Sequence, residues 1–249
     1  MTPPSQNIGS PIIELQQVES TNNYATALVR EGLSEHGCVV WAHHQTAGKG
    51  QRHKQWLAEA GENITMSTVL QPVKIAISQS FLLSMAMALG VHRFFTKYAG
   101  SETKVKWPND LYWHDRKAGG ILIENLLIGT EWQFAVVGTG INVNQASFGG
   151  LGQRAVSLKQ ITGRQFEIKQ LIGELCGCLQ EGYDMLMRSH EEVVDTYHSL
   201  LYKKGEIVRL KKGSRVFDAV VQGVSPLGEL IVEHGVEERF AVGEVEWII

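Results

Sequence analysis

The chain has 249 residues, of which 43% are hydrophobic, and a formal net charge of −3. This length allows one large domain, or a large domain and a small one, with enough apolar residues for a sizeable core. The slightly negative charge excludes the overall basic footprint of typical DNA-binding domains, so any site for an anion must be local.

Cysteine usage and the apolar segments indicate a cytoplasmic protein. Cys38, Cys176 and Cys178 are an odd number and too sparse for a disulfide framework or a metal cluster, so we expect three free thiols. The first residues, "MTPPSQNIGS", lack the basic-then-apolar pattern of a signal peptide. The longest apolar stretch, "FLLSMAMALGVHRFF", is too short to span a membrane. We therefore expect no membrane association.

The first third of the chain alternates helices and strands. "ESTNNYATALVREG" predicts a helix that Ser20 or Thr21 caps and Gly32 ends. "CVVWAHHQ" and "NITMSTVLQP" are rich enough in β-branched and apolar residues to be strands, and Pro72 stops the second. Apolar residues then recur at spacings of three and four over residues 78–98, which predicts a long helix.

The loop between these two strands, within residues 43–56, is rich in glycine and positive charge. It is not a P-loop, because Gly50 follows Lys49 where that motif needs a serine or threonine. Gly48 and Gly50 allow backbone N–H groups to approach a ligand closely. Lys49, Arg52 and Lys54 offer positive charge to an anion. The loop therefore predicts a phosphate site of another kind.

No residues show the spacing of a dedicated metal site or of a Ser-His-Asp triad. His43 and His44 are adjacent on a predicted strand, so their side chains point to opposite faces of the sheet. Two ligands on opposite faces hold one ion only with difficulty. We expect no dedicated metal ligands.

The middle of the chain carries a second charged cluster. "WPND" predicts a turn, and "LYWH" and "GGILIEN" predict two strands joined by the polar turn "DRK". Lys117 directly precedes an apolar strand, so its stem is held against the sheet. Lys106 and Arg116 lie nearby in sequence, with one carboxylate, Asp110, among them. Such a cluster suits acyl or nucleotidyl transfer, in which negative charge builds up in the transition state.

The remainder of the chain indicates one more strand, a helical region and a small all-β module. "QFAVVGTGINVN" is a strand whose end differs from a dinucleotide-binding fingerprint, because Val143 stands in place of the third glycine. Residues 165–200 have a mostly helical period. After "KKG" the pattern changes to short alternating strands with glycine turns, about 45 residues of barrel type. We therefore predict two domains, residues 1–203 and 204–249.

Four motifs in this order carry a family resemblance: "ESTNNYA", "QTAGKGQRHKQW", "KVKWPNDLYWHDRKAGGILIEN" and "GTGINVN". Together they are similar to the catalytic domain of biotin–protein ligases, and the terminal module resembles the small barrel that closes those enzymes. The resemblance implies an α+β fold. Its mixed, mainly antiparallel sheet would be flanked by helices, as in class II aminoacyl-tRNA synthetases, and an SH3-like β-barrel would follow at the C-terminus.

The resemblance also implies the reaction, that of an ATP-dependent biotin–[acetyl-CoA-carboxylase] ligase. Biotin and Mg·ATP give biotinyl-5′-AMP and pyrophosphate. A lysine of a biotin carboxyl carrier domain of a carboxylase then attacks the mixed anhydride to form an amide. ATP, Mg²⁺ and biotin, which is a substrate, are therefore the expected small molecules.

The matched positions imply a role for each site residue. Catalytic roles fall to Lys117, Asp110, Lys49 and Arg52. Biotin contacts fall to Ser20, Thr21, Asn22, Gln45, Gly48, Lys117, Gly119 and Gly120. ATP contacts fall to Lys49, Gly50, Gln51, Arg52, Trp56, Lys106, Asn109 and Asn142.

The loop departs from the family pattern Gly-Arg-Gly-Arg-x-Gly. Lys49 replaces an arginine and loses its bidentate fork, and Gln51 lacks a charge that Arg52 supplies from the next position. His53 stands where the family has glycine, so a positive φ there would be strained. We expect the loop to close as a lid over an acyl-adenylate and to exclude water.

Two alternatives stay open. The first is a lipoate- or octanoate-protein ligase, which has the same fold and also activates its acid by adenylation. The second is a non-catalytic module that only binds a small acid or nucleotide. Some relatives begin with a DNA-binding helix-turn-helix. Here the catalytic motif begins at Ser20, which leaves no room for that module, so we expect no DNA binding. A homodimer formed through edge strands is possible by analogy.

Overall fold

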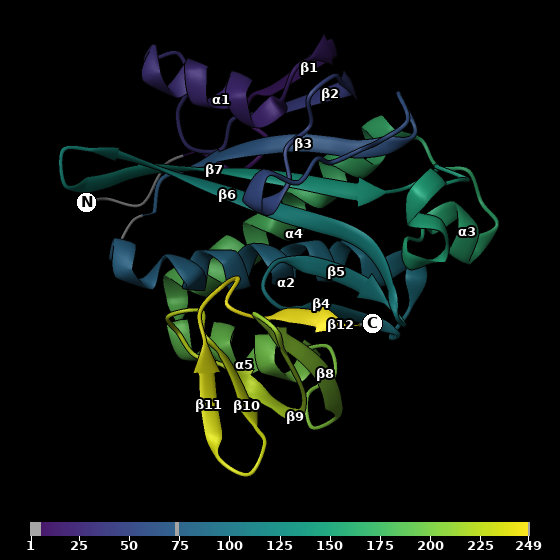
Figure 1. Ribbon diagram of the computed structural model, residues 1–249. Coiled ribbons are helices and arrows are strands. Elements are labelled where there is room, and N and C mark those ends of the chain that lie inside the picture. Colours follow the sequence, from purple (N-terminus) through teal and green to yellow (C-terminus); the bar gives the residue numbers. More distant parts are fainter. Residues whose placement is uncertain (1–5, 73–74, 249) are drawn as a thin grey trace.

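Two β-sheets and five α-helices organise the chain in a computed structural model, which describes residues 6–72 and 75–248 (Figure 1). The strands of the first sheet are β1 (Ile12–Val18), β2 (Val39–Gln45), β3 (Asn63–Leu70), β4 (Thr103–Lys106), β5 (Asp110–Trp113), β6 (Arg116–Ile128) and β7 (Glu131–Asn142). Those of the second are β8 (Ile207–Lys212), β9 (Arg215–Val224), β10 (Leu230–Glu233), β11 (Glu237–Phe240) and β12 (Glu246–Ile248). The helices are α1 (Thr21–Arg30), α2 (Ser80–Ala99), α3 (Leu158–Thr162), α4 (Ile168–Arg188) and α5 (His190–Leu200).

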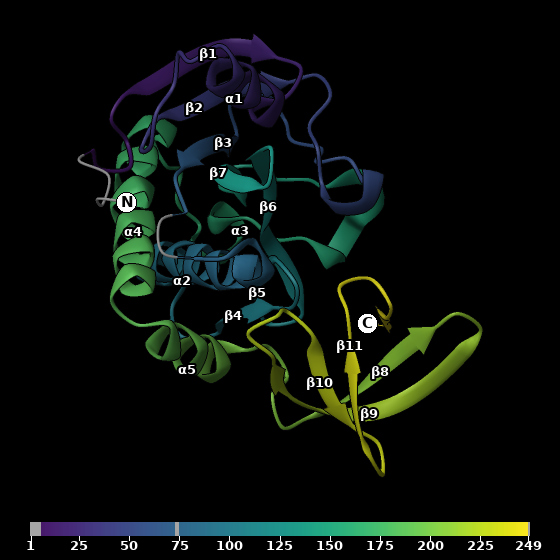
Figure 2. The ribbon, with the colours of Figure 1, turned by 90° about the vertical axis from the view of Figure 1, so that its left-hand side faces the viewer.

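The first sheet is mixed and mainly antiparallel, in the order β1-β2-β3-β7-β6-β5-β4. Only β1 and β2 pair in parallel. Helices α2 and α4 lie together on one side of this sheet (Figure 2), and their apolar residues form the main core with the inward side chains of the strands. The α+β fold predicted from the family resemblance is confirmed.

The opposite face of the sheet is covered only in part by a helix. Helix α1 packs over β2, β3 and β7, where Ala25 closes a small second core with Val40, Val69 and Val136. Ser20 caps this helix by accepting a hydrogen bond from the Asn23 amide, as predicted. On the uncovered part of this face, Gly120 of β6 and Gly138 and Gly140 of β7 have no side chains. This leaves a bare stretch of sheet beside α1.

The second sheet is antiparallel, in the order β11-β10-β9-β8-β12. We call residues 204–249 the C-terminal module. It contacts the turn between β4 and β5, where the Trp107 indole N–H donates to the Gly228 carbonyl at 2.9 Å. The small all-β unit expected after residue 203 is confirmed, whereas the domain boundary between residues 203 and 204 stays a prediction.

The expected turn between β5 and β6 was misplaced. Arg116 and Lys117 were expected in a turn but belong to β6, so the turn before them is His114-Asp115. Gly173, Gly177 and Gly182 do not interrupt α4. At Gly182 a Cβ would come within 2.4 Å of the Ala86 carbonyl oxygen, so this glycine allows α2 and α4 to pack closely.

Strand β1 and the short helix α3 were not expected from the sequence. In the part of the chain that the structure describes, no helix has the length and apolar character needed to cross a membrane.

Candidate active site

A lysine–carboxylate pair lies on the bare stretch of the sheet. Asp110 of β5 is paired in register with Gly120 of β6, and the Lys117 Nζ lies 2.6 Å from the Asp110 Oδ1. The two side chains are 36% and 21% exposed, so solvent and a ligand have access to both. A Cβ at Gly120 would lie 3.4 Å from the Lys117 Nζ. The missing side chain therefore leaves room for the pair over the sheet backbone.

A second lysine lies behind this pair, where β4 meets the C-terminal module. Lys106 is buried, and its Nζ donates to the Tyr112 hydroxyl at 3.2 Å. The ammonium also lies over the rings of Tyr112 and Trp247, at 4.7 and 5.2 Å from their centroids. Burial lowers the pKa of Lys106 to about 8, although the nearby charge of Asp110 opposes this shift. The protein therefore holds a desolvated cation beside the Lys117–Asp110 pair.

Trp56 covers the adjoining stretch of β7. A Cβ at Gly140 would lie 2.5 Å from the Trp56 Cε2, so only glycine allows the indole to lie this close to the strand. The Lys117 Nζ is 5.8 Å from the centroid of the Trp56 ring. The buried Trp56 Nε1 has no hydrogen-bond partner among the described residues. The Trp56 indole ring, with an N–H group that donates to no described residue, therefore borders Lys117.

The loop that carries Trp56 is folded as a short hairpin, and we call residues 48–56 the substrate loop. A β-bridge pairs Lys49 with Gln55, the Trp56 amide donates to the Gly48 carbonyl at 2.9 Å, and the Gly50 amide donates to the Lys54 carbonyl at 2.7 Å. Arg52 of this loop has a left-handed conformation, with φ of 54°. A positive φ in this loop is therefore borne by Arg52, a residue with a side chain.

The two loop cations predicted to be catalytic point away from the Lys117–Asp110 pair. Arg52 donates from Nη1 to the Gly243 carbonyl at 2.7 Å and from Nη2 to the Val242 carbonyl at 3.1 Å. The Lys49 Nζ lies 3.4 Å from a carboxylate oxygen of Glu124 on β6. The structure therefore does not bring Lys49 and Arg52 to the same place as Lys117.

A polar network links the start of α1 to the sheet. Gln45 accepts from the Thr21 amide at 2.8 Å and from the Thr21 hydroxyl at 3.1 Å. Ser67 donates to the Asn22 side-chain oxygen at 2.6 Å, and the Asn22 amide group donates to Glu124 at 2.8 Å. The expected biotin residues Thr21, Asn22 and Gln45 are thus gathered at one end of the bare stretch of sheet.

Glycines shape the floor between the network and the Lys117–Asp110 pair. A Cβ at Gly138 would lie 2.4 Å from the Asn22 Oδ1, and one at Gly48 would lie 2.5 Å from the Trp56 carbonyl oxygen. Gly119 is in register with Ile141 of the main core, so its Cβ position lies on the opposite face of the sheet, 2.8 Å from the Gly140 carbonyl oxygen. Each of these positions accepts only a residue without a side chain. The floor of the site is therefore peptide backbone.

Two predicted ATP residues hold the backbone of the site. Asn142 is buried, and its amide group donates to the carbonyls of Lys117 and Val156, at 3.3 and 3.2 Å. The Asn109 amide group donates to the Ile121 carbonyl at 2.5 Å. These contacts position the strand that bears Lys117, and Asn142 is not directed into open space.

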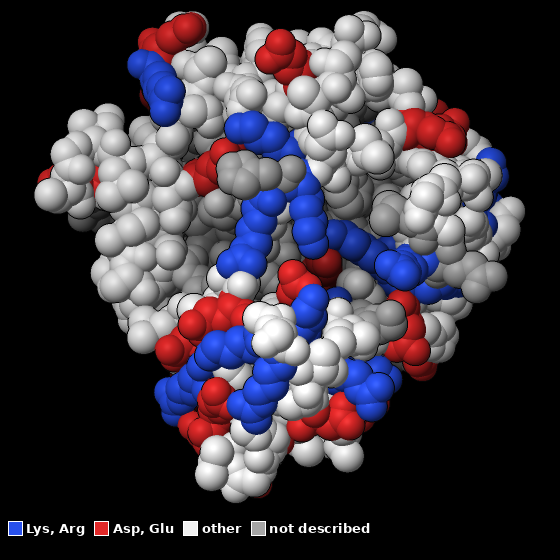
Figure 3. Space-filling model, viewed as in Figure 1, with Lys and Arg blue, Asp and Glu red and all other residues white. Residues whose placement is uncertain are grey.

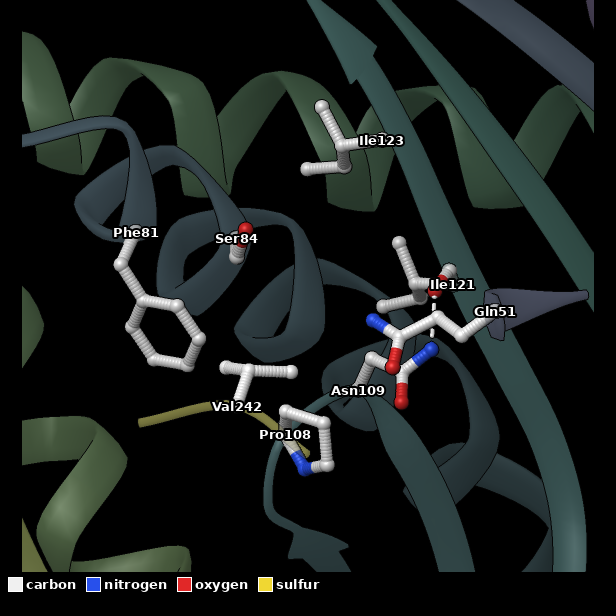
Figure 4. A pocket seen from close by; sticks show the side chains of 8 residues that line it. All are labelled: Gln51, Phe81, Ser84, Pro108, Asn109, Ile121, Ile123 and Val242. Atoms are coloured by element: carbon white, nitrogen blue, oxygen red, sulfur yellow. Dashed lines mark hydrogen bonds between the residues drawn. The ribbon is translucent and has the colours of Figure 1, made fainter. Parts of the chain in front are cut away.

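A small cavity of about 100 Å³ lies on the other face of β6. It is lined by Gln51, Phe81, Ser84, Pro108, Asn109, Ile121, Ile123 and Val242 (Figure 4). Gln51 comes from the substrate loop and Val242 from the C-terminal module. The structure therefore places Gln51 with Asn109, on the far side of β6 from Lys117.

The charge distribution supports an anion site. In Figure 3, lysine and arginine side chains converge on a hollow between the surface of the large sheet and that of the C-terminal module. No group of three or more His, Cys, Asp or Glu in the described ranges has the arrangement of a metal site. His43 and His44 contact different side chains, Glu14 and Gln17. The cations suit an anionic ligand, such as one that carries phosphate groups.

Sequence reasoning missed Ser67, Glu124 and Trp247 at this site. The alternation of Thr65 and Ser67 in β3 was an available signal, because two small polar residues share one face of that strand. Glu124 was a lone acid within an apolar strand. Trp247 had no local signal, because only the packing of the C-terminal module brings it over Lys106.

A sequence model of the Biotin/lipoate A/B protein ligase family matches residues 14–142, which is just over half of the chain. The Bifunctional ligase/repressor BirA of Bacillus spizizenii is 28% identical over 230 residues, which cover 91% of this chain and 70% of that protein. The Biotin--[acetyl-CoA-carboxylase] ligase of Paracoccus denitrificans is 27% identical over 225 residues, 88% of this chain and 92% of that one.

A solved structure shows the same architecture. The biotin protein ligase from Aquifex aeolicus in complex with biotin and ATP superposes with a TM-score of 0.79 at 25% identity. The match covers 95% of this chain and 98% of that chain. The likeness therefore extends over both the large sheet and the C-terminal module.

Proposed function

This chain belongs to the biotin/lipoate A/B protein ligase family, and from that membership we propose that its Lys117–Asp110 pair is the reactive centre of an ATP-dependent biotin–protein ligase. The activity is supported by the names of relatives that align along most of the chain, and by the neighbour whose structure holds biotin and ATP. The observation that carries the proposal is the lysine and carboxylate 2.6 Å apart over a glycine floor.

In the first half-reaction, a carboxylate oxygen of biotin attacks the α-phosphorus of Mg·ATP. The new C–O–P linkage forms as the bond between the α-phosphorus and the bridging oxygen breaks, and pyrophosphate leaves. Lys117 is positioned to stabilise the negative charge shared by the carboxylate and the α-phosphate. The buried cation Lys106 adds to the positive potential behind it. Trp56 offers a flat surface against which an adenine ring can stack.

In the second half-reaction, a neutral lysine amine of the acceptor attacks the acyl carbon of the anhydride. A C–N bond forms, the C–O bond to AMP breaks, and the amine loses a proton. Asp110 is the described carboxylate closest to Lys117, at 2.6 Å, and would orient that amine and accept the proton. The amide product and AMP then leave.

The biotin head would lie at the other end of the glycine floor, against Thr21, Asn22 and Gln45. These side chains form one network with Ser67 and Glu124, and amide and hydroxyl groups suit a ureido ring that both donates and accepts hydrogen bonds. Binding would exchange some of the internal hydrogen bonds for bonds to biotin. Ser20 is buried as the helix cap and supports this end of the site from behind.

The acceptor is proposed to be the biotin carrier domain of a carboxylase. The P. denitrificans relative, which aligns over nearly its whole length, is named for acetyl-CoA carboxylase. The absence of DNA binding and the formation of a homodimer stay predictions. Strands β1 and β4 are the two edges of the large sheet and would be the places for a dimer formed by strand pairing.

The deciding experiment measures pyrophosphate release from Mg·ATP with biotin, lipoate or octanoate, each with hydroxylamine to trap the acyl-adenylate. Release with biotin alone supports the biotin ligase. Release with lipoate or octanoate alone keeps the adenylation mechanism and overturns the substrate. If no acid leads to pyrophosphate release while ATP or biotin still binds, a non-catalytic binding module is favoured.

A further inference from the structure

The tip of the substrate loop is held by the C-terminal module. The guanidinium of Arg52 spans two consecutive carbonyl groups, those of Val242 and Gly243, with N–O distances of 3.1 and 2.7 Å. Arginine suits this arrangement because its planar fork presents parallel N–H donors, which a lysine lacks. Residues 190 positions apart in the sequence are thus joined by two charge-assisted hydrogen bonds.

The turn that accepts these bonds is shaped for Arg52. Gly243 has φ of +88°, and a Cβ built on it would lie 1.3 Å from the Arg52 Nη2. An alanine there would therefore meet both backbone strain and the guanidinium itself. Gly235 is in the same module and has the same φ of +88°, but no described atom lies within 4 Å of its Cβ position. The steric requirement at Gly243 therefore comes from Arg52.

The loop is strained where it makes this contact. Arg52 has φ of 54°, an unfavourable conformation for a residue with a side chain, which the surrounding contacts must stabilise. On either side of the contact, Gln51 and Val242 line the same small cavity with Asn109 (Figure 4). The loop tip and the turn thus close over β6 together.

We propose that the Val242–Gly243 turn is a positioning element for the substrate loop. By accepting both hydrogen bonds of Arg52, it holds the loop, and Trp56 at its base, over the Lys117 centre, and it thereby retains the acyl-adenylate until an acceptor lysine arrives. Retention of the acyl-adenylate rests on the proposed ligase function, whereas the positioning of the loop by the Val242–Gly243 turn does not. Arg52 is then a positioning residue that acts through the loop.

The first test is amide hydrogen exchange in the ligand-free protein, which needs no activity. The variant is Gly243→Ala, and the matched control is Gly235→Ala, which imposes the same backbone strain in the same module without contacting Arg52. We expect the hydrogen-bonded amides of Gly50, Lys54 and Trp56 to exchange at least about tenfold faster in Gly243→Ala, and at the wild-type rate in Gly235→Ala. Equal exchange in the two variants would overturn the proposal.

The second test measures pyrophosphate release with biotin and Mg·ATP and without acceptor protein. Wild type should release about one pyrophosphate per site in a burst and then turn over slowly, because the bound adenylate blocks the site. Gly243→Ala should keep the burst and raise the later rate at least about tenfold, as the adenylate escapes. An unchanged later rate in a variant with a loosened loop would overturn the role in retention. A wild-type protein that turned over steadily without a burst would likewise overturn retention, whereas one that released no pyrophosphate with biotin would contradict the ligase function.

A variant of Arg52 tests the same contact without changing the turn, so it keeps the test valid if Gly243→Ala misfolds. Arg52→Gln removes the fork and leaves the turn intact, so it should accelerate exchange at the same three amides. The double variant Arg52→Gln/Gly243→Ala should exchange no faster than either single variant, because both remove one interaction. Additive effects would overturn the proposal.

Discussion

Single residues on a glycine floor carry the chemistry proposed for this protein. The Lys117 ammonium and the Asp110 carboxylate are 2.6 Å apart, and each remains partly exposed to an incoming ligand. The sheet beside them is peptide backbone, because Gly120 and its register partner Gly140 have no side chains. A lysine beside a carboxylate can exchange that partner for a phosphate or carboxylate of the substrate, and the carboxylate is then available to an amine. The first half-reaction needs a positive charge and the second needs a negative one, and the Lys117–Asp110 pair can therefore serve both.

Replacing Lys117 tests the first half-reaction. Lys117→Ala removes the cation that would stabilise the α-phosphate, so we expect biotin-dependent pyrophosphate release to slow by about 10²- to 10³-fold. The protein should unfold at nearly the wild-type temperature, because the side chain is partly exposed. Stopped-flow pyrophosphate detection and thermal denaturation provide the two readouts. Turnover near the wild-type rate would remove Lys117 from the mechanism.

Replacing Asp110 separates the two half-reactions. Asp110→Asn preserves the shape of the side chain but abolishes its charge, so we expect transfer from preformed adenylate to the acceptor lysine to slow by about 10²-fold or more. Adenylation should change much less, because Lys117 keeps its charge. Single-turnover transfer to a carrier domain measures the step. An equal loss in both half-reactions would assign Asp110 to positioning Lys117 only.

At the scale of elements, strand alternation and glycine placement decide which face of the sheet becomes the site. Gly120 of β6 is in register with Gly140 of β7, so two glycines lie side by side on the face away from α2 and α4. The substrate loop packs Trp56 into that gap. Helix α1 stops short of it and presents Thr21 and Asn22 at its N-terminal end. A helix, a loop and two strands therefore enclose one hollow.

Filling the glycine gap should displace the loop without unfolding the sheet. In Gly140→Ala, the new Cβ would lie 2.5 Å from the Trp56 Cε2, so the indole must move away from β7. We expect the KM for ATP to rise at least about tenfold, equivalent to about 1.4 kcal/mol, with the fold retained. Steady-state kinetics and circular dichroism measure both. Gly150→Ala is the control, because no described atom lies within 4 Å of its Cβ position. An unchanged KM would show that Trp56 does not support nucleotide binding.

At the scale of the whole molecule, the C-terminal module completes the environment of the catalytic sheet. Its Trp247 lies over Lys106, and the carbonyl of Gly228 accepts a hydrogen bond from Trp107. The pKa of Lys106 is lowered to about 8 mainly by burial, and the packing of the module contributes to that burial. The electrostatics of the centre therefore depend on residues more than 100 positions away in the sequence.

The buried lysine makes stability depend on pH in a defined direction. The pKa of Lys106 is about 8 in the folded protein against 10.5 for the ordinary group, so the unfolded chain binds more protons between these values. The cost of burying the ammonium is therefore complete below about pH 8 and falls as the pH rises toward 10.5.

We expect Lys106→Met to stabilise the fold at pH 7 by on the order of 1–3 kcal/mol, and by less at pH 9.5. Denaturant unfolding at the two pH values measures this difference. A variant less stable than wild type at pH 7 would mean that the ring contacts of the ammonium outweigh its desolvation.

Most of the elements and the family could be predicted from local sequence. The capped helix at Ser20, the strands of β-branched residues and the glycine-punctuated module all depend on neighbouring residues, and "KWPND" with "RKAGGIL" indicated a biotin–protein ligase, a prediction that is confirmed. The proximity of Lys117 and Asp110 could also be anticipated, because they lie seven positions apart on two strands joined by a short turn.

Only the tertiary structure decided what Lys49 and Arg52 of the substrate loop contact. The sequence indicated one anion-binding motif formed by Lys49, Arg52 and Lys54. In the structure, Lys49 pairs with Glu124, and Arg52 donates hydrogen bonds to the carbonyls of Val242 and Gly243. The sequence by itself determined that the loop is cationic, glycine-rich and able to approach a ligand. Its contacts depend on β6 and on the C-terminal module, which meet the loop only after the chain has folded, and no local pattern records distances between segments so far apart.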